Sequence, residues 1–513
     1  MSMSTLNRRE FLQQGLTVAG VTGLGLYAAA CAPDVLTPTP NAELLTTAPG
    51  VAGDLAEPPV IASVGGRIKT AIVAQTQPTS LAGRTVAEPV TYNATLPAPT
   101  LRVRPGDWMD VTFTNRIVFD QADTKPGYGR PPRATNTTNL HFHGMHLSPV
   151  GTADNMLVTV APNASFRYFL QVPFNHQAGL FWYHAHVHGL VTNHVSRGAA
   201  GMVYVENSYT DQIARLGIRR RLLMLHQAYF ADDLRTLIYD DGARDDPNLA
   251  LSLINGQLLP DIRIQPGEPQ VWSLLNASSS TFYLLRIAGH TLDVIADDGV
   301  PLPTPRLGRE TVLIPSGKRL EVVVRGNGTP GRYPVSYDAY NQGVDTWPAK
   351  AIGTLVVGGQ KWTGPAHPGV DVSGCPVDLS SGNIKKDRTR LLVLGQNNNV
   401  PEGEFGRFTI NGHPWDPSYS EWTSTLGTVE EWVFRNDTQQ DHPMHVHVNP
   451  VQVVKINNVP VAFDGYQDTF IVPRFGSLTA RTRFTDFAGG PILIHCHILD
   501  HEDMGMMTRF EIV

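Results

Sequence analysis

Four short segments of the chain concentrate residues that bind transition metals. They read H-F-H-G from His141, H-A-H from His184, H-P-M-H-V-H from His442 and H-C-H-I-L-D-H-E-D-M-G-M from His495. Ten of the 18 histidines lie in these segments, together with a cysteine and methionines. Imidazole, thiolate and thioether are softer ligands than carboxylates, so this combination favours copper over hard cations such as magnesium or calcium.

The last segment contains the ligands of a blue-copper electron-transfer centre. Cys496 is followed by His501 five residues later and by Met506 ten residues later, and His442 supplies a second imidazole. One thiolate, two imidazoles and a weak axial thioether are the ligands of such a centre. On a β-strand the histidines on either side of the cysteine point to the opposite face. We therefore expect one strand to serve two metal sites, with a short covalent route for electrons between them.

The other histidines form four pairs with the spacing i and i+2, which places both rings of a pair on one face of a strand. The pairs are His141 and His143, His184 and His186, His445 and His447, and His495 and His497. One such pair alone is more often a surface feature, and a lone Met506 is more often a core residue. A structural zinc site closes with four ligands, so eight converging histidines indicate a multinuclear redox site with three coppers. We expect His146, His188 and His194 to be exposed or to support ligands by hydrogen bonds.

The four segments resemble those of the multicopper oxidases, specifically the three-domain, laccase-like bacterial branch. The resemblance implies four copper ions. Type 2 copper would take His141 and His445, and the type 3 pair His143, His184, His186, His447, His495 and His497; type 1 copper would take His442, Cys496, His501 and Met506. The chain departs from the usual pattern in H-V-H-V-N-P and at Asn155, where glycine is common in the family; neither change removes a ligand.

The resemblance implies an enzyme that oxidises a reducing substrate in four one-electron steps and reduces dioxygen to water. Electrons would enter at His501 and pass through Cys496. Reduction of dioxygen consumes four protons, and Glu502 and Asp154 are our candidates for supplying them. The alternative for Glu502 is a surface acid beside Asp500 and Asp503.

Three functions from different classes stay open at this stage. The first is a laccase-like oxidase of phenols and aromatic amines. The second is a metallo-oxidase of Cu(I), Mn(II) or Fe(II), although the 11 methionines form no methionine-rich insert of the kind expected in a dedicated cuprous oxidase. The third is a non-catalytic scaffold, which is the weakest because no ligand position is lost.

A long internal repeat predicts the domain organisation. A turn glycine is followed nine residues later by an asparagine in three segments with alternating apolar residues, 106–115, 267–276 and 427–436. Glycine and proline, at 47 and 39 residues, are more frequent than average and predict many turns. We predict an all-β protein of three consecutive Greek-key β-sandwiches, which the resemblance narrows to cupredoxin-like domains.

The predicted domains span residues 58–206, 207–372 and 373–513. The first two metal-binding segments lie in the first domain and the last two in the third, so the multinuclear site must form where these two domains meet. The middle domain has no comparable histidine cluster, and we expect it to space and clamp the other two.

The amino-terminal region resembles a twin-arginine export signal. Arg8 and Arg9 precede a short apolar stretch, and we predict a signal peptide at 1–30 and a Pro/Thr/Ala-rich leader or tether at 31–57. This predicts a periplasmic or otherwise extracytoplasmic protein. Cys31 has two interpretations, either following a signal peptidase site or carrying a lipid anchor, and Cys375 is expected to be an unpaired thiol. With a net charge of −6 and no long basic runs, nothing indicates a nucleic-acid partner.

Overall fold

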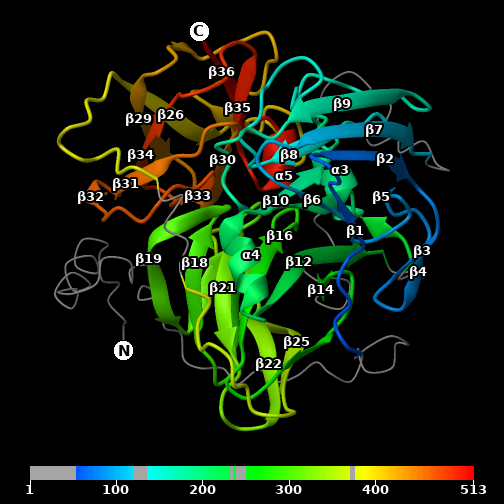
Figure 1. The fold of residues 1–513 in the computed structure, drawn as a ribbon. Helices are drawn as coiled ribbons and strands as arrows, with labels where there is room; N and C mark the ends of the chain where they lie inside the picture. Colours follow the sequence, from blue (N-terminus) through cyan, green and yellow to red (C-terminus); the bar gives the residue numbers. More distant parts are fainter. Residues whose placement is uncertain (1–52, 119–135, 232–234, 239–249, 370–375) are drawn as a thin grey trace, which may run out of the picture.

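The computed structural model describes residues 53–118, 136–231, 235–238, 250–369 and 376–513. The predicted signal peptide, Cys31 and Cys375 lie outside these ranges, as does the predicted boundary at 372 and 373. Strands dominate the described residues, which confirms the all-β prediction. They form three groups of sheets (Figure 1): the first, blue to cyan, and the third, orange to red, lie above the second, which is green to yellow. No described helix is long and apolar enough to span a membrane.

The first sandwich contains a five-stranded and a four-stranded sheet. The strand order in the five-stranded sheet is β1 (Val60–Ala62), β6 (Ala98–Val103), β11 (Ala200–Val205), β10 (Gly179–His184) and β8 (His141–His143). The order in the four-stranded sheet is β5 (Thr91–Tyr92), β2 (Arg67–Gln75), β7 (Trp108–Arg116) and β9 (Ser165–Gln171). A hairpin of β3 (Thr79–Leu81) and β4 (Arg84–Val86) and the helix α3 (Val191–Ser196) complete it. Helix α4 (Ser208–Arg215) follows before the second sandwich.

The second sandwich contains a seven-stranded and a five-stranded sheet. The strand order in the seven-stranded sheet is β13 (Leu237–Ile238), β12 (Arg219–Phe230), β16 (Pro269–Asn276), β21 (Arg319–Arg325), β18 (Leu292–Asp297) and β19 (Val300–Arg309), and β14 (Ala250–Ile254) also pairs with β12. The order in the five-stranded sheet is β15 (Asp261–Ile264), β25 (Lys350–Val357), β22 (Gly331–Asp338), β17 (Tyr283–Ile287) and β20 (Thr311–Ile314). A small ribbon of β23 (Tyr340–Asn341) and β24 (Thr346–Trp347) follows.

The third sandwich contains a six-stranded and a five-stranded sheet. The strand order in the six-stranded sheet is β27 (Phe408–Ile410), β26 (Arg388–Gln396), β29 (Val429–Asn436), β34 (Ser477–Arg483), β31 (Gln452–Ile456) and β32 (Val459–Pro460). The order in the five-stranded sheet is β28 (Thr423–Ser424), β36 (Met507–Ile512), β35 (Pro491–Cys496), β30 (His442–Val446) and β33 (Thr469–Val472). Helix α5 (Leu499–Asp503) connects β35 to β36.

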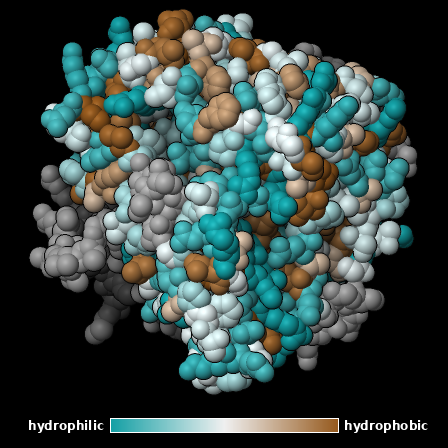
Figure 2. Space-filling model, in the orientation of Figure 1, coloured by the Kyte–Doolittle hydropathy of each residue, from teal (hydrophilic) through white to brown (hydrophobic). Residues whose placement is uncertain are grey.

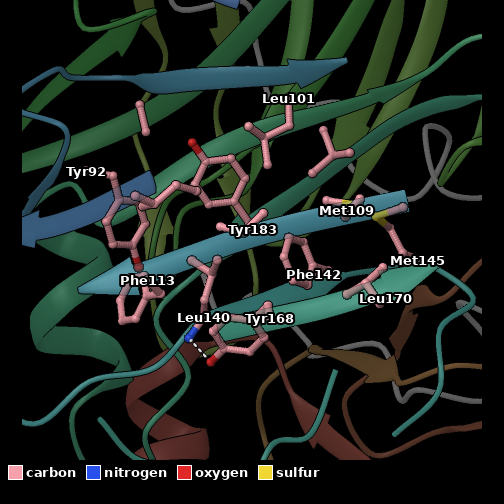
Figure 3. Packing of buried hydrophobic residues seen from close by; sticks show 14 of the residues in the cluster. Tyr92, Leu101, Met109, Phe113, Leu140, Phe142, Met145, Tyr168, Leu170 and Tyr183 are labelled. Carbon is pink, nitrogen blue, oxygen red and sulfur yellow. Dashed lines mark hydrogen bonds between the residues drawn. The ribbon is translucent and has the colours of Figure 1, made fainter. Parts of the chain in front are cut away.

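Each sandwich has its own apolar core, as alternating strands require. In the first, Phe113, Tyr168 and Tyr183 pack with other buried side chains between the two sheets (Figure 3). The face of the molecule in Figure 2 is largely hydrophilic at its centre, and its hydrophobic groups are scattered in small areas. The apolar side chains thus serve mainly the three interiors.

The repeated asparagine performs the same role in all three sandwiches. It is buried at the end of a central strand, where its amide group donates to two backbone carbonyls in neighbouring segments. The acceptors are Asn136 and Val160 for Asn115, Thr281 and Ile314 for Asn276, and Gln440 and Val472 for Asn436. The repeat in the sequence is therefore a repeat in structure.

The end of the predicted leader is not a free tether. The backbone amide of Leu55 donates to the carbonyl of Asp261 at 2.9 Å, and that of Asp261 donates to the carbonyl of Gly53 at 2.8 Å. Strand β15 lies at the edge of its sheet and offers unpaired backbone groups, which explains why residues 53–55 dock there. Composition alone could not identify this edge.

Candidate metal centre

Two strand pairs position the histidine pairs. In the first sandwich β8 and β10 are antiparallel, with His141 opposite His184. In the third, β30 and β35 are antiparallel, with His445 opposite His495. The side chains of residues directly opposite each other on neighbouring strands lie close together, so each antiparallel strand pair brings imidazoles together.

The core of the first sandwich fixes the direction of the first pair. Phe142 points into the core, and the hydroxyl group of Tyr168 accepts a hydrogen bond from the backbone amide of Leu140 at 2.9 Å (Figure 3). Because side chains alternate along a strand, His141 and His143 project away from this core.

The eight paired histidines meet between the first and third sandwiches, a region that we call the seam. They are His141, His143, His184, His186, His445, His447, His495 and His497, all buried. The rings of His143 and His445 stack across the seam with centroids 3.7 Å apart, and those of His141 and His447 with centroids 4.2 Å apart. The sequence prediction that the terminal domains build one shared cluster matches this arrangement.

Nitrogen atoms within the seam converge in small groups. The Nε2 atom of His495 lies 3.3 Å from that of His186 and 3.1 Å from that of His447. His143, His184 and His497 form a second group whose ligand atoms lie within 4.8 Å of one another. His141 and His445 lie together in a third group with His143.

Hydrogen bonds select the tautomers of these rings. The Nδ1 atoms of His184, His445 and His495 lie 2.9–3.0 Å from the backbone carbonyls of Ala185, Asp468 and Cys496, so these atoms carry the protons. The Nε2 atom of each of these rings is then unprotonated and presents a lone pair. Among the described residues, the Nε2 atoms of His141, His184, His445 and His497 and the Nδ1 atom of His143 have no hydrogen-bond partner. Buried lone pairs without partners are costly, and a metal ion satisfies them.

Burial keeps the imidazoles neutral. Desolvation, reinforced by neighbouring histidines, lowers the pKa well below the ordinary value of 6.5 for His141, His143, His184, His447 and His497. Desolvation also lowers the pKa of His186 and His495 to about 4. Neutral imidazole is the form that binds metals, so the seam is ready for ligation at neutral pH.

A separate group forms around Cys496 on the other side of β35. Its Sγ atom lies 3.5 Å from Nδ1 of His442 and 3.8 Å from Nδ1 of His501, and these two nitrogens are 3.3 Å apart. The hydroxyl group of Thr438 lies 2.7 Å from Nε2 of His442, which leaves Nδ1 as the lone pair facing the sulfur. Met506 is fully buried, and its backbone carbonyl accepts from the amide of Cys496 at 3.0 Å.

Burial raises the pKa of the Cys496 thiol well above its ordinary value. A thiolate here needs an adjacent cation to offset its desolvation, and a soft metal ion between the sulfur and two imidazoles provides one. The donor sets of both groups fit copper, and the seam adds buried nitrogens without a hydrogen-bond partner among the described residues.

Both predicted acids lie beside seam histidines. Glu502 is fully buried, with Oε2 3.0 Å from Nδ1 of His495 and Oε1 3.4 Å from Nδ1 of His186, so the alternative of a surface acid is wrong. Burial raises its pKa to about 7. Asp154 lies 3.0 Å from Nδ1 of His141, and burial raises its pKa to about 8.

Three other histidines lie close in the sequence to the seam histidines. The ring of His146 lies 2.8 Å from the carbonyl of Val448 and 3.0 Å from Asp486. His188 is buried beside Phe405, and His194 is buried in α3. The prediction of exposure is wrong for His188 and His194, and the ring of His146 bonds to residues that are not predicted ligands.

The sequence prediction missed Asp468 and Arg319. Asp468 lies 3.5 Å from Nε2 of His143 and 3.3 Å from Nδ1 of His445, and Arg319 pairs with it at 2.6 Å. Asp468 has no motif around it. The K-R pair that begins the apolar run L-E-V-V-V in β21 was a usable signal, because cations rarely enter a buried strand without partners.

Comparisons with known proteins agree with the geometry. Three family models described as multicopper oxidase match residues 132–209, 182–359 and 386–513. A laccase from Bacillus stratosphericus is 23% identical, covering 82% of this chain and 90% of its own. The cell division protein FtsP of Dickeya dadantii is 26% identical over 98% of each chain.

A solved structure supports the fold. A multicopper oxidase from Campylobacter jejuni, described as a metallo-oxidase, superimposes with a TM-score of 0.72 at 20% identity, covering 90% of this chain and 95% of that chain. This similarity confirms the prediction of three cupredoxin-like sandwiches.

Proposed function

Because the chain belongs to the multicopper oxidase family, whose members are copper oxidoreductases that use dioxygen, we propose a laccase-like function for it. It oxidises phenolic or aromatic amine substrates in four one-electron steps and reduces dioxygen to water. The observation that carries this proposal is the seam, where eight buried, neutral histidines from two sandwiches converge beside the Cys496 group.

The distances support an assignment of ligands to four ions. His442, Cys496 and His501 would hold type 1 copper, with the buried Met506 as the fourth ligand that the family resemblance implies. His141 and His445 would hold type 2 copper. The type 3 pair would be held by His143, His184 and His497 on one side and by His186, His447 and His495 on the other. When bound, copper supplies the one-electron redox chemistry and the site at which dioxygen is reduced.

The chain itself provides the connection between the two centres. Cys496 lies between His495 and His497 in the sequence, and its side chain faces His442 and His501 whereas theirs face the seam. Electrons therefore travel from the thiolate to the seam through a few covalent bonds of β35. No mobile carrier is needed between the centres.

Glu502 and Asp154 deliver the protons that the reaction consumes. Each carboxyl group lies about one hydrogen-bond length from a seam imidazole and has a pKa raised by burial, so each can hold a proton near neutral pH. Four protons are consumed for each dioxygen, so both carboxyl groups take up further protons from bulk water during the cycle.

His501 is the point of electron entry in this proposal. Its side chain is only 3% exposed, and the ring of Phe408 stacks on it with centroids 3.9 Å apart. Electrons cross such a thin layer without direct contact between the substrate and the metal site.

The same burial favours a second candidate, a metallo-oxidase of Cu(I), Mn(II) or Fe(II). A bulky aromatic substrate gains little contact with a ring that is 3% exposed, whereas a small ion needs only a nearby binding position. A non-catalytic scaffold is not favoured because every ligand position is filled, although FtsP is among the relatives.

Oxygen uptake by the copper-loaded protein tests the proposal. The substrates are a panel of phenols, aromatic amines, Cu(I), Mn(II) and Fe(II), with the Cys496→Ser protein as the matched control. We expect uptake with phenols that the control lacks. A strong preference for one metal ion would replace the laccase assignment with the metallo-oxidase, and equal uptake by the control would refute both.

A further inference from the structure

A turn of the middle sandwich reaches into the seam. Residues 315–318 connect β20 to β21, and Gly317 in this turn has φ of +82°. A Cβ atom on Gly317 would lie 2.6 Å from the ring of His497, so only glycine allows this approach. The turn therefore packs directly against a seam imidazole.

Ser316 selects the tautomer of that imidazole. Its hydroxyl group donates to the carbonyl of Ser278, so its oxygen can only accept from Nδ1 of His497, 3.1 Å away. The proton of His497 is thereby held on Nδ1, and the lone pair on Nε2 faces the seam. Among described atoms this Nε2 has no hydrogen-bond partner.

Arg319 acts on the seam through Asp468. Two guanidinium nitrogens of Arg319 donate to the two carboxylate oxygens of Asp468 at 2.7 and 2.6 Å, and both side chains are buried. The same carboxylate lies 3.5 Å from Nε2 of His143 and 3.3 Å from Nδ1 of His445. One ion pair thus supports a ring from each terminal sandwich.

The glycine of the H-F-H-G segment makes room for this ion pair. A Cβ atom at Gly144, whose φ is +79°, would lie 2.1 Å from Nη2 of Arg319 and 2.7 Å from Oδ2 of Asp468. Arg319 also donates to the carbonyl of Leu180 at 3.3 Å, in the strand that carries His184. Its position is therefore fixed from all three sandwiches.

Lys318 and Asp298 anchor the loop that presents Asp468. Lys318 donates to Asp298 at 3.0 Å and to the carbonyl of Thr469 at 2.8 Å. Asp298 in turn accepts from the backbone amides of Asp468 and Thr469 at 3.0 and 2.9 Å. The loop from the third sandwich is held by charges of the second.

We propose that Ser316 and Arg319, on the middle sandwich, are positioning residues for the trinuclear copper cluster; this inference rests on the proposed function. Ser316 orients His497 through a hydrogen bond, and Arg319 acts on His143 and His445 through the carboxylate of Asp468; both leave the Cys496 group untouched. The middle sandwich thus contributes to the metal site although it supplies no ligand.

The first test uses Ser316→Ala, which removes one hydroxyl group. The matched control is Ser273→Ala in the same sandwich, whose buried hydroxyl donates to Glu321 at 2.9 Å. Copper is titrated into each protein, and the near-ultraviolet band of the type 3 pair is followed beside the visible thiolate-to-copper band. We expect Ser316→Ala to weaken copper binding at the type 3 pair by about tenfold, as is typical for loss of a partner that orients a ligand. The visible band should saturate as in wild type.

The second test uses Arg319→Lys, which keeps the charge and loses the fork that holds both carboxylate oxygens. Its control is Arg220→Lys, since Arg220 is paired in the same sandwich with Glu321 at 2.6 Å. We expect the type 2 paramagnetic resonance signal to need about tenfold more copper in Arg319→Lys and to be unchanged in the control. The visible band again reports that the third sandwich is folded.

The outcomes separate the two proposals. If wild type shows all copper signals and Ser316→Ala and Arg319→Lys bind copper as wild type does, the positioning role is refuted and the proposed function stands. Equal weakening in the controls also refutes it, because any change to the middle sandwich then has the same effect. A wild-type protein that binds no copper at the seam refutes both.

Discussion

The Cys496 group and the seam are built in opposite ways. All four residues of the first come from the third sandwich, on β30, β35 and the segment around α5. The seam takes four histidines from each terminal sandwich, and its supporting ion pair joins Arg319 of the middle sandwich to Asp468 of the third. The first can form when one domain folds, whereas the second requires all three to dock.

This difference shows where the protein is vulnerable. Docking is maintained by buried polar contacts such as Asp503 of α5, which accepts from the backbone amides of Gly189 and Thr192 at 2.6 and 2.8 Å beside α3. When one partner of a buried ion pair or charged hydrogen bond is removed, the other partner is left as a buried polar group without compensation. We therefore expect changes outside the third sandwich to affect the seam and to spare the Cys496 group.

The largest expected effect is that of Cys496→Ser. The hydroxyl group is a poor substitute for the thiolate, so electron entry is lost while the seam keeps its ligands. Oxidase activity should fall by more than the ~100-fold typical of residues that only support ligands. Absorption spectra should show no visible thiolate band and a retained near-ultraviolet band. If both bands disappear together, the two centres are not separate.

Effects of intermediate size are expected from two asparagine substitutions, one in the second sandwich and one in the third. Asn276→Ala and Asn436→Ala each leave two buried carbonyls without a donor, which should cost about 3 kcal/mol of unfolding free energy in denaturant titrations. Only Asn436→Ala should shift the visible copper band, because Asn436 accepts from Thr438, which in turn contacts His442. A shifted band in Asn276→Ala would contradict the independence of the Cys496 group.

The smallest effect is expected from Met506→Leu. Leucine would remove the neutral thioether that Met506 would offer to type 1 copper, and it would nearly keep the shape of the side chain. We expect the type 1 potential to rise by about 60 mV, which is a tenfold change for a one-electron couple, as measured by redox titration of the visible band. The type 2 signal should not change. A fall in potential would show that the thioether of Met506 does not bind type 1 copper.

Much of the fold was predictable because its signals are local. Gly106, Gly267 and Gly427 each begin a turn before an alternating strand, and the asparagines nine residues later make equivalent hydrogen bonds in the three sandwiches. Turn conformation and strand alternation depend on nearest neighbours, so the sequence pattern carries them directly. The docking of residues 53–55 on β15 depends on a distant edge and was not predictable.

The sequence alone determined the donor types and the alternation that directs Cys496 away from His495 and His497, since both follow from residue identity and strand geometry. Only the tertiary structure decided which nitrogens meet, which tautomers are selected and which charges support them. Asp468 meets His445 where β30 pairs with β33, and Arg319 and Ser316 become neighbours of the seam only when the sandwiches dock. Contacts of this kind depend on the packing of whole domains, which no local pattern of residues records.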